Sequence, residues 1–398
     1  MDDTQGFFQS SAVEKGTESC YTFERPRHER ESMKIKILPF LVFFLFAVSA
    51  LLLLPGLLRN QGSVPSLEQT CLSPIPLCAH PSHDPESQHC NVCGLLVCHE
   101  YIGGICSCGK EFAFTIDYFD PSLWDACEEK GIVETVEYET RDVNGSVYRK
   151  QMEVYLPYGY SADQKYNVLL LLHGSGGDEH YWFKERGYVY PWGDSPWEKF
   201  STVLDNMINR KICRPAIVVS PTCYLDEEAR EAGGHFEDDV QQMRYEVIRD
   251  ILPTVVKRYS TYASGGDYSS LCAARDHFGF LGASYGGMLC CNAILTYDID
   301  VFSWFAAVSG LYANVPEMNA AWETLGFQKL KIRYLYTSAG DQDRMLEDTQ
   351  ESFSSLLRFS PKITEENSCF VQVTGAQHEE RVWDNAVYDC LQFFFNGV

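Results

Sequence analysis

The feature of this sequence best suited to chemistry is a serine set between small residues. The run from Phe278 to Gly287 is predicted as an apolar strand, a G-x-S-x-G turn around Ser284, and a helix. Glycine tolerates the tight backbone of such a turn, which presents the serine hydroxyl at the end of the strand. Backbone N–H groups at the start of the helix could stabilise a developing oxyanion. The pattern indicates a nucleophile, although an ordinary strand-to-helix turn with a bystander serine has the same residues.

Two later loops supply the groups that a nucleophilic serine needs. An acidic loop with Asp341 and Asp343 follows the apolar run 332–336, and His378 follows the run 370–373. A carboxylate can orient a histidine, which in turn accepts the serine proton. The order serine, aspartate, histidine, each at the end of its own strand, is that of α/β-hydrolases. Position in the loop alone does not decide whether Asp341 or Asp343 is the acid that orients the histidine.

A glycine-rich loop, H-G-S-G-G, follows the apolar run 167–172 and begins at His173. Such a loop can bring a backbone N–H close to a reacting carbonyl. We predict an oxyanion hole formed by Gly174, Ser175 and Tyr285. His173 precedes the serine in an order that this fold does not use, so we interpret it as structural.

Alternating strands and helices from residue 131 onward must position these loops. Continuous apolar runs are typical of strands buried on both faces of a parallel sheet. Apolar and polar residues alternate in the first strand, and an Asn-Gly turn joins it to the second. Helical spacing extends from 236 to 259, where Pro253 is expected to bend the helix. We therefore predict an α/β fold for 131–398, with a doubly wound, mostly parallel sheet and active residues at the carboxyl ends of strands. The predicted strands are 132–138, 147–156, 167–172, 216–220, the strand that begins at 278 and runs into the serine turn, 304–308, 332–336 and 370–373.

The charge and the N-terminal third indicate where the chain works. A net charge of -23 over 398 residues argues against a nucleic-acid partner. Residues 1–36 are predicted as a disordered cytoplasmic tail, 37–58 as an uncharged transmembrane signal-anchor, and 59–89 as a linker. Basic residues before the anchor predict that the rest of the chain is extracellular at the cell membrane. A cleaved signal peptide beginning near Met33 is the alternative, in which case the protein is secreted.

The segment 90–130 is rich in cysteine and short of apolar residues. Its C-x-x-C-G and C-x-C-G turns are similar to the two knuckles of a zinc ribbon. The predicted ligands of a structural zinc ion are Cys90, Cys93, Cys106 and Cys108, with His89 and His99 as substitutes. Disulfides are the alternative in an exported segment. Neither interpretation makes the segment catalytic.

Several motifs resemble the esterase-D-like α/β-hydrolases, which include the feruloyl and acetylxylan esterases of carbohydrate esterase family 1. They lie at 155–161, 165–177 and 276–287, and in the histidine loop that carries His378 and Trp383. The resemblance covers about residues 134–396, and a methionine commonly stands in that family where this chain has Tyr285. In the family the acid follows a glycine by three residues, which selects Asp343.

The resemblance implies a serine carboxylic ester hydrolase with a Ser284-His378-Asp343 triad and no cofactor for catalysis. Together with the predicted compartment, it implies a membrane-anchored extracellular esterase that releases feruloyl or acetyl groups from polysaccharide. Trp182 and Trp383 are predicted to bind substrate, although both could be core residues. The alternatives are an acyltransferase or small-ester hydrolase of the same fold, and a non-catalytic surface binding protein on a hydrolase scaffold.

Overall fold

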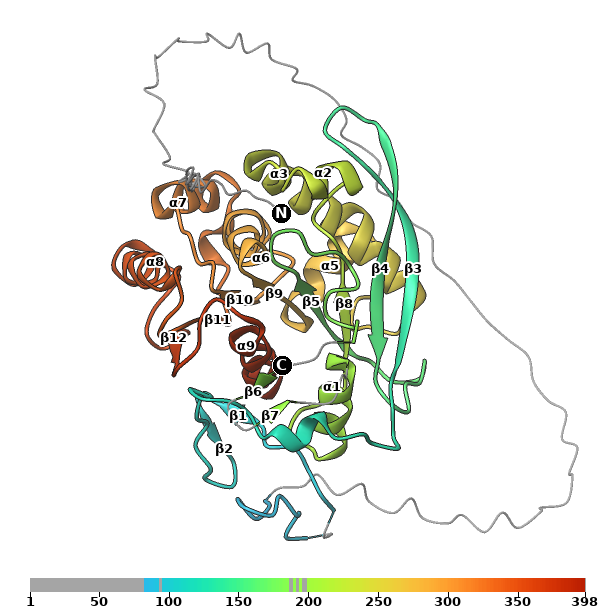
Figure 1. Ribbon diagram of the computed structural model, residues 1–398, viewed down its shortest axis with the longest axis vertical. Coiled ribbons are helices and arrows are strands. Elements are labelled where there is room, and N and C mark those ends of the chain that lie inside the picture. The colour runs from blue at the N-terminus through green and yellow to red at the C-terminus, as the bar shows by residue number, and fades with distance from the viewer. Residues whose placement is uncertain (1–81, 93–94, 186–188, 191–192, 195–198, 398) are drawn as a thin grey trace, which may run out of the picture. The chain divides into compact units, whose positions relative to one another are not determined.

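The computed structural model describes residues 82–92, 95–185, 189–190, 193–194 and 199–397 (Figure 1). The chain divides into two compact units, Met1–Cys71 and Leu72–Val398, and every described residue belongs to the second. The predicted tail 1–36, the predicted anchor 37–58 and most of the predicted linker 59–89 lie outside the described residues. Within the described part of the chain, no helix is both long enough and apolar enough to span a bilayer.

An eight-stranded sheet, in the order β12-β11-β10-β9-β5-β8-β4-β3, forms the centre of the second unit. The pairs β3–β4 and β4–β8 are antiparallel and the remaining pairs are parallel. This confirms the predicted mostly parallel sheet. The strands are β3 (Ile132–Arg141), β4 (Val147–Leu156), β5 (Asn167–Leu172), β8 (Ala216–Ser220), β9 (Phe278–Ala283), β10 (Trp304–Val308), β11 (Tyr334–Gly340) and β12 (Ser368–Val373).

Both faces of this sheet are covered, as the continuous apolar runs predict. In β5, Val168, Leu170 and Leu172 point into one hydrophobic core, whereas Leu169 and Leu171 point into the other. Successive side chains of a strand face opposite ways, so each core receives every second residue. All six residues of β5 are buried, and the five that follow Asn167 are apolar without interruption.

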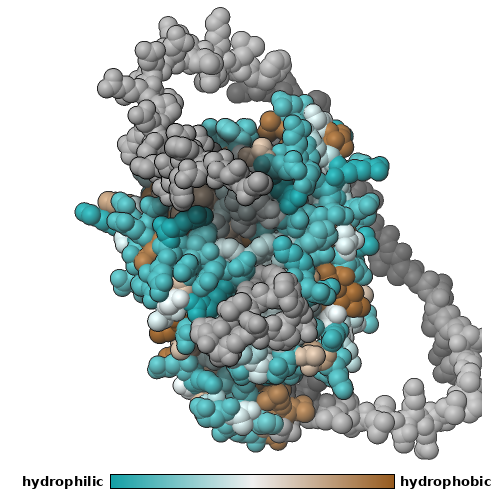
Figure 2. Space-filling model, in the orientation of Figure 1, coloured by the Kyte–Doolittle hydropathy of each residue, from teal (hydrophilic) through white to brown (hydrophobic). Residues whose placement is uncertain are grey.

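The helices form a layer on each face of the sheet (Figure 1). Residues of α1 and α9 belong to the core that contains Leu169, and residues of α3 to α8 belong to the other. The face of the molecule in Figure 2 is mostly hydrophilic, with hydrophobic residues in small separate groups. The helices are α1 (Phe200–Asn209), α2 (Glu227–Glu231), α3 (Phe236–Glu246), α4 (Leu252–Arg258), α5 (Tyr268–Ala273), α6 (Tyr285–Leu289), α7 (Val315–Thr324), α8 (Leu346–Phe359) and α9 (Glu380–Phe393).

The helix predicted over 236–259 is interrupted just before Pro253. A π-helical turn, Val247–Ile251, separates α3 from α4, and Pro253 lies in the first turn of α4. Proline has no N–H and crowds the carbonyl of the preceding turn, so regular α-helical bonding cannot continue through it. The helix therefore loses its regular hydrogen bonding close to the predicted position.

The cysteine-rich segment forms a two-stranded sheet of β1 (Tyr101–Ile102) and β2 (Ile105–Cys106). A second short hairpin consists of β6 (Val189–Tyr190) and β7 (Gly193–Asp194). The segment contacts the main body at α9, where the rings of Phe112 and Phe393 lie 5.3 Å apart. It is therefore packed onto the body that contains the eight-stranded sheet.

Candidate active site

Ser284 lies on a strained turn between β9 and α6. Its φ is 52° and its ψ is -115°, a conformation that is uncommon for a residue with a side chain. Neighbouring backbone leaves no room for side chains there. A Cβ on Gly282 would lie 1.9 Å from the carbonyl oxygen of Gly286, and one on Gly286 would lie 2.5 Å from that of His173. The small residues of the predicted turn are thus required by close backbone contacts.

The structure brings Ser284, His378 and Asp343 together in one hydrogen-bonded chain. His378 Nε2 lies 2.8 Å from Ser284 Oγ, and His378 Nδ1 lies 2.9 Å from Asp343 Oδ1. The Asp343 side chain is fully buried, while the His378 side chain is 16% exposed. A serine at the solvent-facing end, an imidazole in the middle and a buried carboxylate form the arrangement that activates a serine nucleophile.

Of the two aspartates in the acidic loop, Asp343 contacts the histidine. Its Oδ1 also accepts a hydrogen bond of 2.8 Å from the backbone N–H of Met345. Burial alone would raise the pKa of Asp343, but the hydrogen bonds from His378 and Met345 outweigh burial and lower it. Asp343 is therefore ionised at neutral pH. The geometry favours Asp343 over Asp341, as the glycine spacing predicts.

The glycine-rich loop after β5 lies against the serine. A Cβ on Gly174 would be 3.2 Å from the Cβ of Ser284, and Ser175 beside it is exposed. The N–H of Tyr285, the first residue of α6, has no acceptor within its own helix because it belongs to the first turn. The three predicted oxyanion-hole residues therefore lie around the serine as expected, and their role remains a prediction.

His173 is fully buried beneath this loop, as the structural interpretation predicts. Its Nδ1 lies 2.6 Å from the carbonyl oxygen of Gly174, and its Nε2 lies 3.1 Å from the hydroxyl of Thr222. Burial lowers the pKa of His173 to about 4, so the ring is neutral at physiological pH. A neutral ring with both nitrogens engaged holds the loop and is not available as a base.

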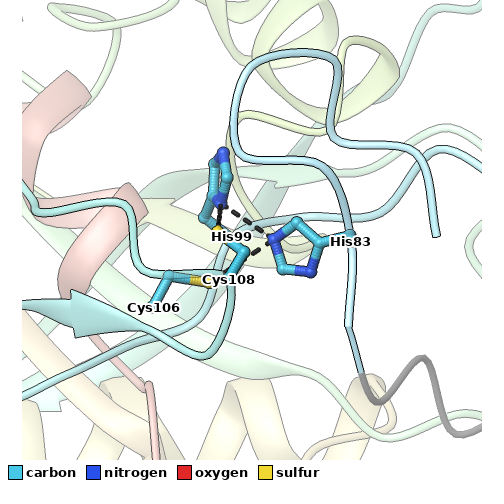
Figure 3. Close-up of side chains that lie close together, drawn as sticks. All are labelled: His83, His99, Cys106 and Cys108. Carbon is cyan, nitrogen blue, oxygen red and sulfur yellow. Dashed lines mark hydrogen bonds between the residues drawn. The ribbon is translucent and has the colours of Figure 1, made fainter. Parts of the chain in front are cut away.

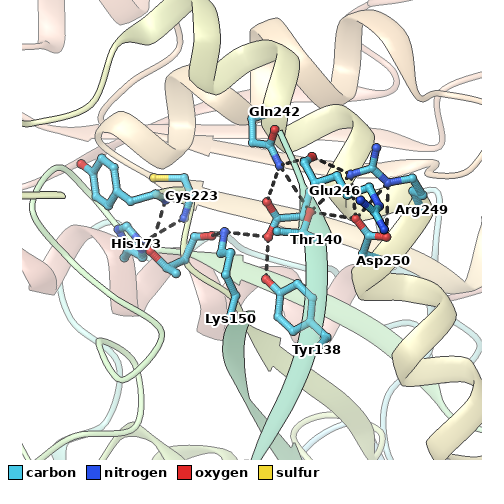
Figure 4. Close-up of polar contacts among 12 residues, drawn as sticks. Tyr138, Thr140, Lys150, His173, Cys223, Gln242, Glu246, Arg249 and Asp250 are labelled. Carbon is cyan, nitrogen blue, oxygen red and sulfur yellow. Dashed lines mark hydrogen bonds and ion pairs between the residues drawn. The ribbon is translucent and has the colours of Figure 1, made fainter. Parts of the chain in front are cut away.

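A buried polar network extends from His173 toward α3 (Figure 4). Lys150 donates to the carbonyl of Thr222 at 2.9 Å and forms an ion pair with Glu246 at 2.6 Å. Glu246 also accepts a hydrogen bond from Tyr138. Since both charges are buried, each depends on the other for compensation. The sequence analysis missed this network, because its members lie far apart in the chain and follow no local pattern.

Tyr285, the residue after the serine, is tied to α3 by its side chain. Its hydroxyl donates to Asp239 Oδ2 at 2.6 Å, and its ring lies parallel to that of Tyr224 at 6.3 Å. Burial raises the pKa of Asp239 despite this hydrogen bond. The Tyr224 hydroxyl accepts the backbone N–H of Gly176 at 3.0 Å. The serine turn and the glycine-rich loop are thus joined through Tyr285 and Tyr224.

The two tryptophans predicted to bind substrate lie in the interior. The side chain of Trp182 is fully buried and packs edge-on against Phe200 at 5.7 Å, so it acts as a core residue and the predicted substrate contact needs correction. Trp383 is 8% exposed, and its ring lies edge-on to His378 at 5.7 Å. That contact makes Trp383 a support for the histidine ring. Both rings add buried apolar area to the core and are therefore little exposed for stacking on a substrate.

The predicted zinc ligands are only partly brought together. Cys106 and Cys108 lie in a cluster with His83 and His99 (Figure 3). Cys90 and His89 are not part of this cluster, and Cys93 lies outside the described residues. His99 was predicted as a substitute ligand, whereas His83 was placed in the linker. Of the predicted set, the structure groups only Cys106 and Cys108 with His99, and a zinc ion bound by all four predicted cysteines stays a prediction. No disulfide joins any two cysteines of the described ranges.

Comparison with known proteins by sequence finds a xylan-degrading enzyme. No family model matches the chain. The endo-1,4-beta-xylanase Y of Acetivibrio thermocellus is 28% identical over 286 residues, which make up 69% of this chain and 24% of that protein. The chain thus spans about a quarter of the length of this relative.

Comparison by structure finds feruloyl esterases. The feruloyl esterase module from Clostridium thermocellum, complexed with sinapinate, matches with a TM-score of 0.59 and 24% identity over 73% of this chain and 98% of the module. The CE1 ferulic acid esterase from the anaerobic fungus Anaeromyces mucronatus, in complex with ferulic acid, matches with a TM-score of 0.54 and 16% identity. The match covers 72% of this chain and 99% of that esterase. These matches confirm the predicted resemblance at the level of the fold.

Proposed function

We propose that this protein is a serine carboxylic ester hydrolase that releases feruloyl or acetyl groups from polysaccharide. The observation that supports it most is the hydrogen-bonded chain from Ser284 through His378 to the buried Asp343. The feruloyl esterase fold and the sequence similarity to a xylanase favour an acyl group on a plant polysaccharide. All reacting groups belong to the chain, so we propose that catalysis needs no cofactor.

The geometry supports acyl transfer in two steps. Ser284 Oγ attacks the ester carbonyl and transfers its proton to His378 Nε2, while backbone N–H groups of Ser175 and Tyr285 stabilise the oxyanion. The C–O bond to the alcohol breaks as the histidine returns the proton to the leaving oxygen. Water then attacks the acyl-serine with His378 as the base, and the carboxylic acid leaves. Asp343 keeps Nδ1 protonated throughout, so that Nε2 faces the serine as an acceptor.

A polar cavity beside the glycine loop suits the sugar part of such a substrate. It has a volume of about 310 Å³ and is lined by charged and amide side chains, among them Arg149 and Gln151. Tyr224, which binds the loop, lines it as well. Hydroxyl-rich ligands need donors and acceptors of this kind. We propose that sugar units next to the esterified residue occupy this cavity.

We also propose that the enzyme works outside the cell, held at the membrane by residues 37–58. The support is in the sequence alone, because this segment is uncharged, is about as long as a bilayer-spanning helix, and follows a basic stretch. A polysaccharide substrate requires the same compartment. Protease protection of residues 72–398 in intact cells would contradict this location.

Hydrolysis by the full chain in detergent tests the function. We expect release of p-nitrophenol from p-nitrophenyl acetate and of ferulate from methyl ferulate, with both lost in Ser284→Ala. Ser269→Ala, at an exposed serine away from the site, is the matched control. Equal product release by Ser284→Ala and the wild type would refute the esterase proposal. An excess of ester product over free acid in the presence of an added alcohol would indicate acyl transfer in place of hydrolysis.

Substrate choice is tested separately with feruloylated and acetylated xylan fragments. If the polar cavity binds sugar, Arg149→Ala should raise KM for feruloylated xylan fragments and leave KM for methyl ferulate unchanged. An equal change for both substrates would argue against a sugar subsite at this position.

A further inference from the structure

We propose that His83, His99, Cys106 and Cys108 bind one zinc ion, which holds together residues 83–108, next to the part of the chain that packs against the end of α9. The potential ligand atoms of these four residues all lie within 4.8 Å of one another, and three of the four residues are buried (Figure 3). This set differs from the four cysteines of the C-x-x-C and C-x-C turns. It takes only the second turn and replaces the first with two histidines.

The spacing of the ligand atoms fits a tetrahedral ion. Zn–N bonds of about 2.05 Å and Zn–S bonds of about 2.3 Å place a nitrogen and a sulfur roughly 3.6 Å apart. Cys106 Sγ lies 3.4 Å from His83 Nε2, and Cys108 Sγ lies 3.5 Å from His99 Nδ1. The two ring nitrogens are 2.9 Å apart, against roughly 3.35 Å around an ion. A small outward movement of the two rings would complete the site.

The donor chemistry favours zinc in a closed, structural role. Two thiolates and two neutral imidazoles balance the charge of Zn²⁺ without any carboxylate. Two sulfur and two nitrogen donors in tetrahedral arrangement select zinc over the harder cations, which prefer oxygen. Four protein ligands leave no open position for a reacting water molecule. The ion would therefore hold the fold of the segment and take no part in ester hydrolysis.

The segment needs such a fastening because it has little core of its own. Its two strands have two residues each, and the apolar side chains Val92, Leu95, Ile102 and Ile105 are exposed. A short segment that buries so little apolar surface is commonly stabilised by a metal or by disulfides. No disulfide joins described cysteines of this segment.

The contacts of the segment show what the ion would hold in place. The ring of Phe112 lies against Phe393, and Glu100 accepts the backbone N–H of Gly397 at 3.2 Å. The backbone N–H of Thr115 donates to Asp389 at 3.0 Å. These contacts lie in the last turns of α9 and just after it, whereas His378 precedes its first turn. A helix of this length extends about 20 Å, so the ion would stabilise α9 from the end away from the triad.

Metal analysis of the full chain in detergent tests this proposal. We expect one zinc per chain after purification from zinc-containing medium, and loss of that zinc in His83→Ala, His99→Ala, Cys106→Ser and Cys108→Ser. Cys98→Ser is the matched control, because this cysteine lies in the same segment and donates to the carbonyl of Cys213 instead. A wild-type protein without stoichiometric zinc would overturn the proposal, as would zinc retained in His83→Ala but lost in Cys90→Ser.

Cobalt substitution keeps the test decisive if a variant fails to fold. The wild-type protein loaded with Co²⁺ should show the visible bands of a tetrahedral ion and charge-transfer absorption from two thiolates. Absorption that corresponds to four thiolates would instead support the ligand set of the two cysteine turns. The thermal unfolding midpoint of the zinc protein should fall on addition of a chelator, and that of Cys98→Ser should fall equally. An unchanged unfolding midpoint would show that the ion does not stabilise the segment.

Discussion

Replacement of Asp343 by asparagine tests how the site controls its histidine. The carboxylate is fully buried, and its contact with His378 Nδ1 is 2.9 Å long. An amide of the same shape presents either an N–H or a neutral oxygen to that nitrogen. In the first case the ring must carry its proton on Nε2, which then faces Ser284 as a donor and cannot accept the serine proton.

The size of the effect follows from this loss of the correct tautomer. In serine hydrolases the corresponding exchange lowers kcat about 10⁴-fold, which is about 5.4 kcal/mol of transition-state stabilisation. We expect a loss between roughly 10³-fold and 10⁴-fold for Asp343→Asn, with KM little changed because the carboxylate does not reach the substrate. Asp341→Asn is the matched control, since Asp341 forms neither a hydrogen bond nor an ion pair with His378, and its activity should stay within about threefold of the wild type.

The assay is steady-state hydrolysis of p-nitrophenyl acetate between pH 6 and pH 9. The pKa of Asp343 is held below its usual value, so the carboxylate is ionised over this whole range and its own titration cannot distort the comparison. Thermal unfolding of each variant shows that the protein remains folded. A larger loss in Asp341→Asn than in Asp343→Asn would refute the assignment of the acid. A loss below tenfold in Asp343→Asn would show that the buried contact does not control the tautomer.

Three other substitutions test the support of the site. Gly310→Ala should abolish activity, because the added Cβ would lie 2.0 Å from the backbone carbonyl oxygen of Ser284. Gly265→Ala, whose Cβ would meet only movable side-chain atoms, should keep activity, and equal activities of the two variants would contradict this reasoning. Lys150→Met should lower the free energy of unfolding in urea by about 3 kcal/mol, because it leaves Glu246 buried without its ion-pair partner, and Lys150→Met with Glu246→Gln should recover part of that loss. Burial raises the pKa of Asp389 to about 7, so the folded protein binds a proton that the unfolded chain releases near pH 4, and this residue makes stability fall as pH rises from about 4 to about 7. Asp389→Asn lacks that contribution, so its stability relative to wild type should increase between pH 4.5 and pH 7.5, and a constant difference would show that Asp389 does not titrate there.

The sheet and the grouping of Ser284, His378 and Asp343 could be predicted because each leaves a local pattern in the sequence. A strand buried on both faces gives a continuous apolar run, as in β5, and a loop that follows such a run must reach the carboxyl edge of the sheet. Ser284, Asp343 and His378 each follow a strand in this way. Their positions therefore follow from short stretches of sequence, and the fold brings the stretches together.

The residues that the sequence analysis missed or misplaced depend on pairings between distant stretches. Lys150 and Glu246 form a buried ion pair between β4 and α3, and either residue alone is typical of a solvated position. Trp182 lies in a loop that suggests exposure, yet it is fully buried and its ring packs against Phe200 of α1. His83 stands in a polar stretch with no ligand motif, and only the fold places it beside Cys106. No periodicity in the sequence encodes these contacts.

The stretch before residue 131 is part of the same hydrophobic core as the hydrolase fold. Phe119, Leu123 and Trp124 are buried in the core that α1 and α9 share, and the carbonyl of Leu123 accepts a hydrogen bond from Asn206 in α1. The sequence change near residue 131 therefore marks the first strand of the sheet, and the packed body begins earlier. Since α9 follows directly on the loop of His378, the groups that hold this helix also hold one wall of the active site. The proposed zinc ion would stabilise that wall through a segment that takes no part in the chemistry.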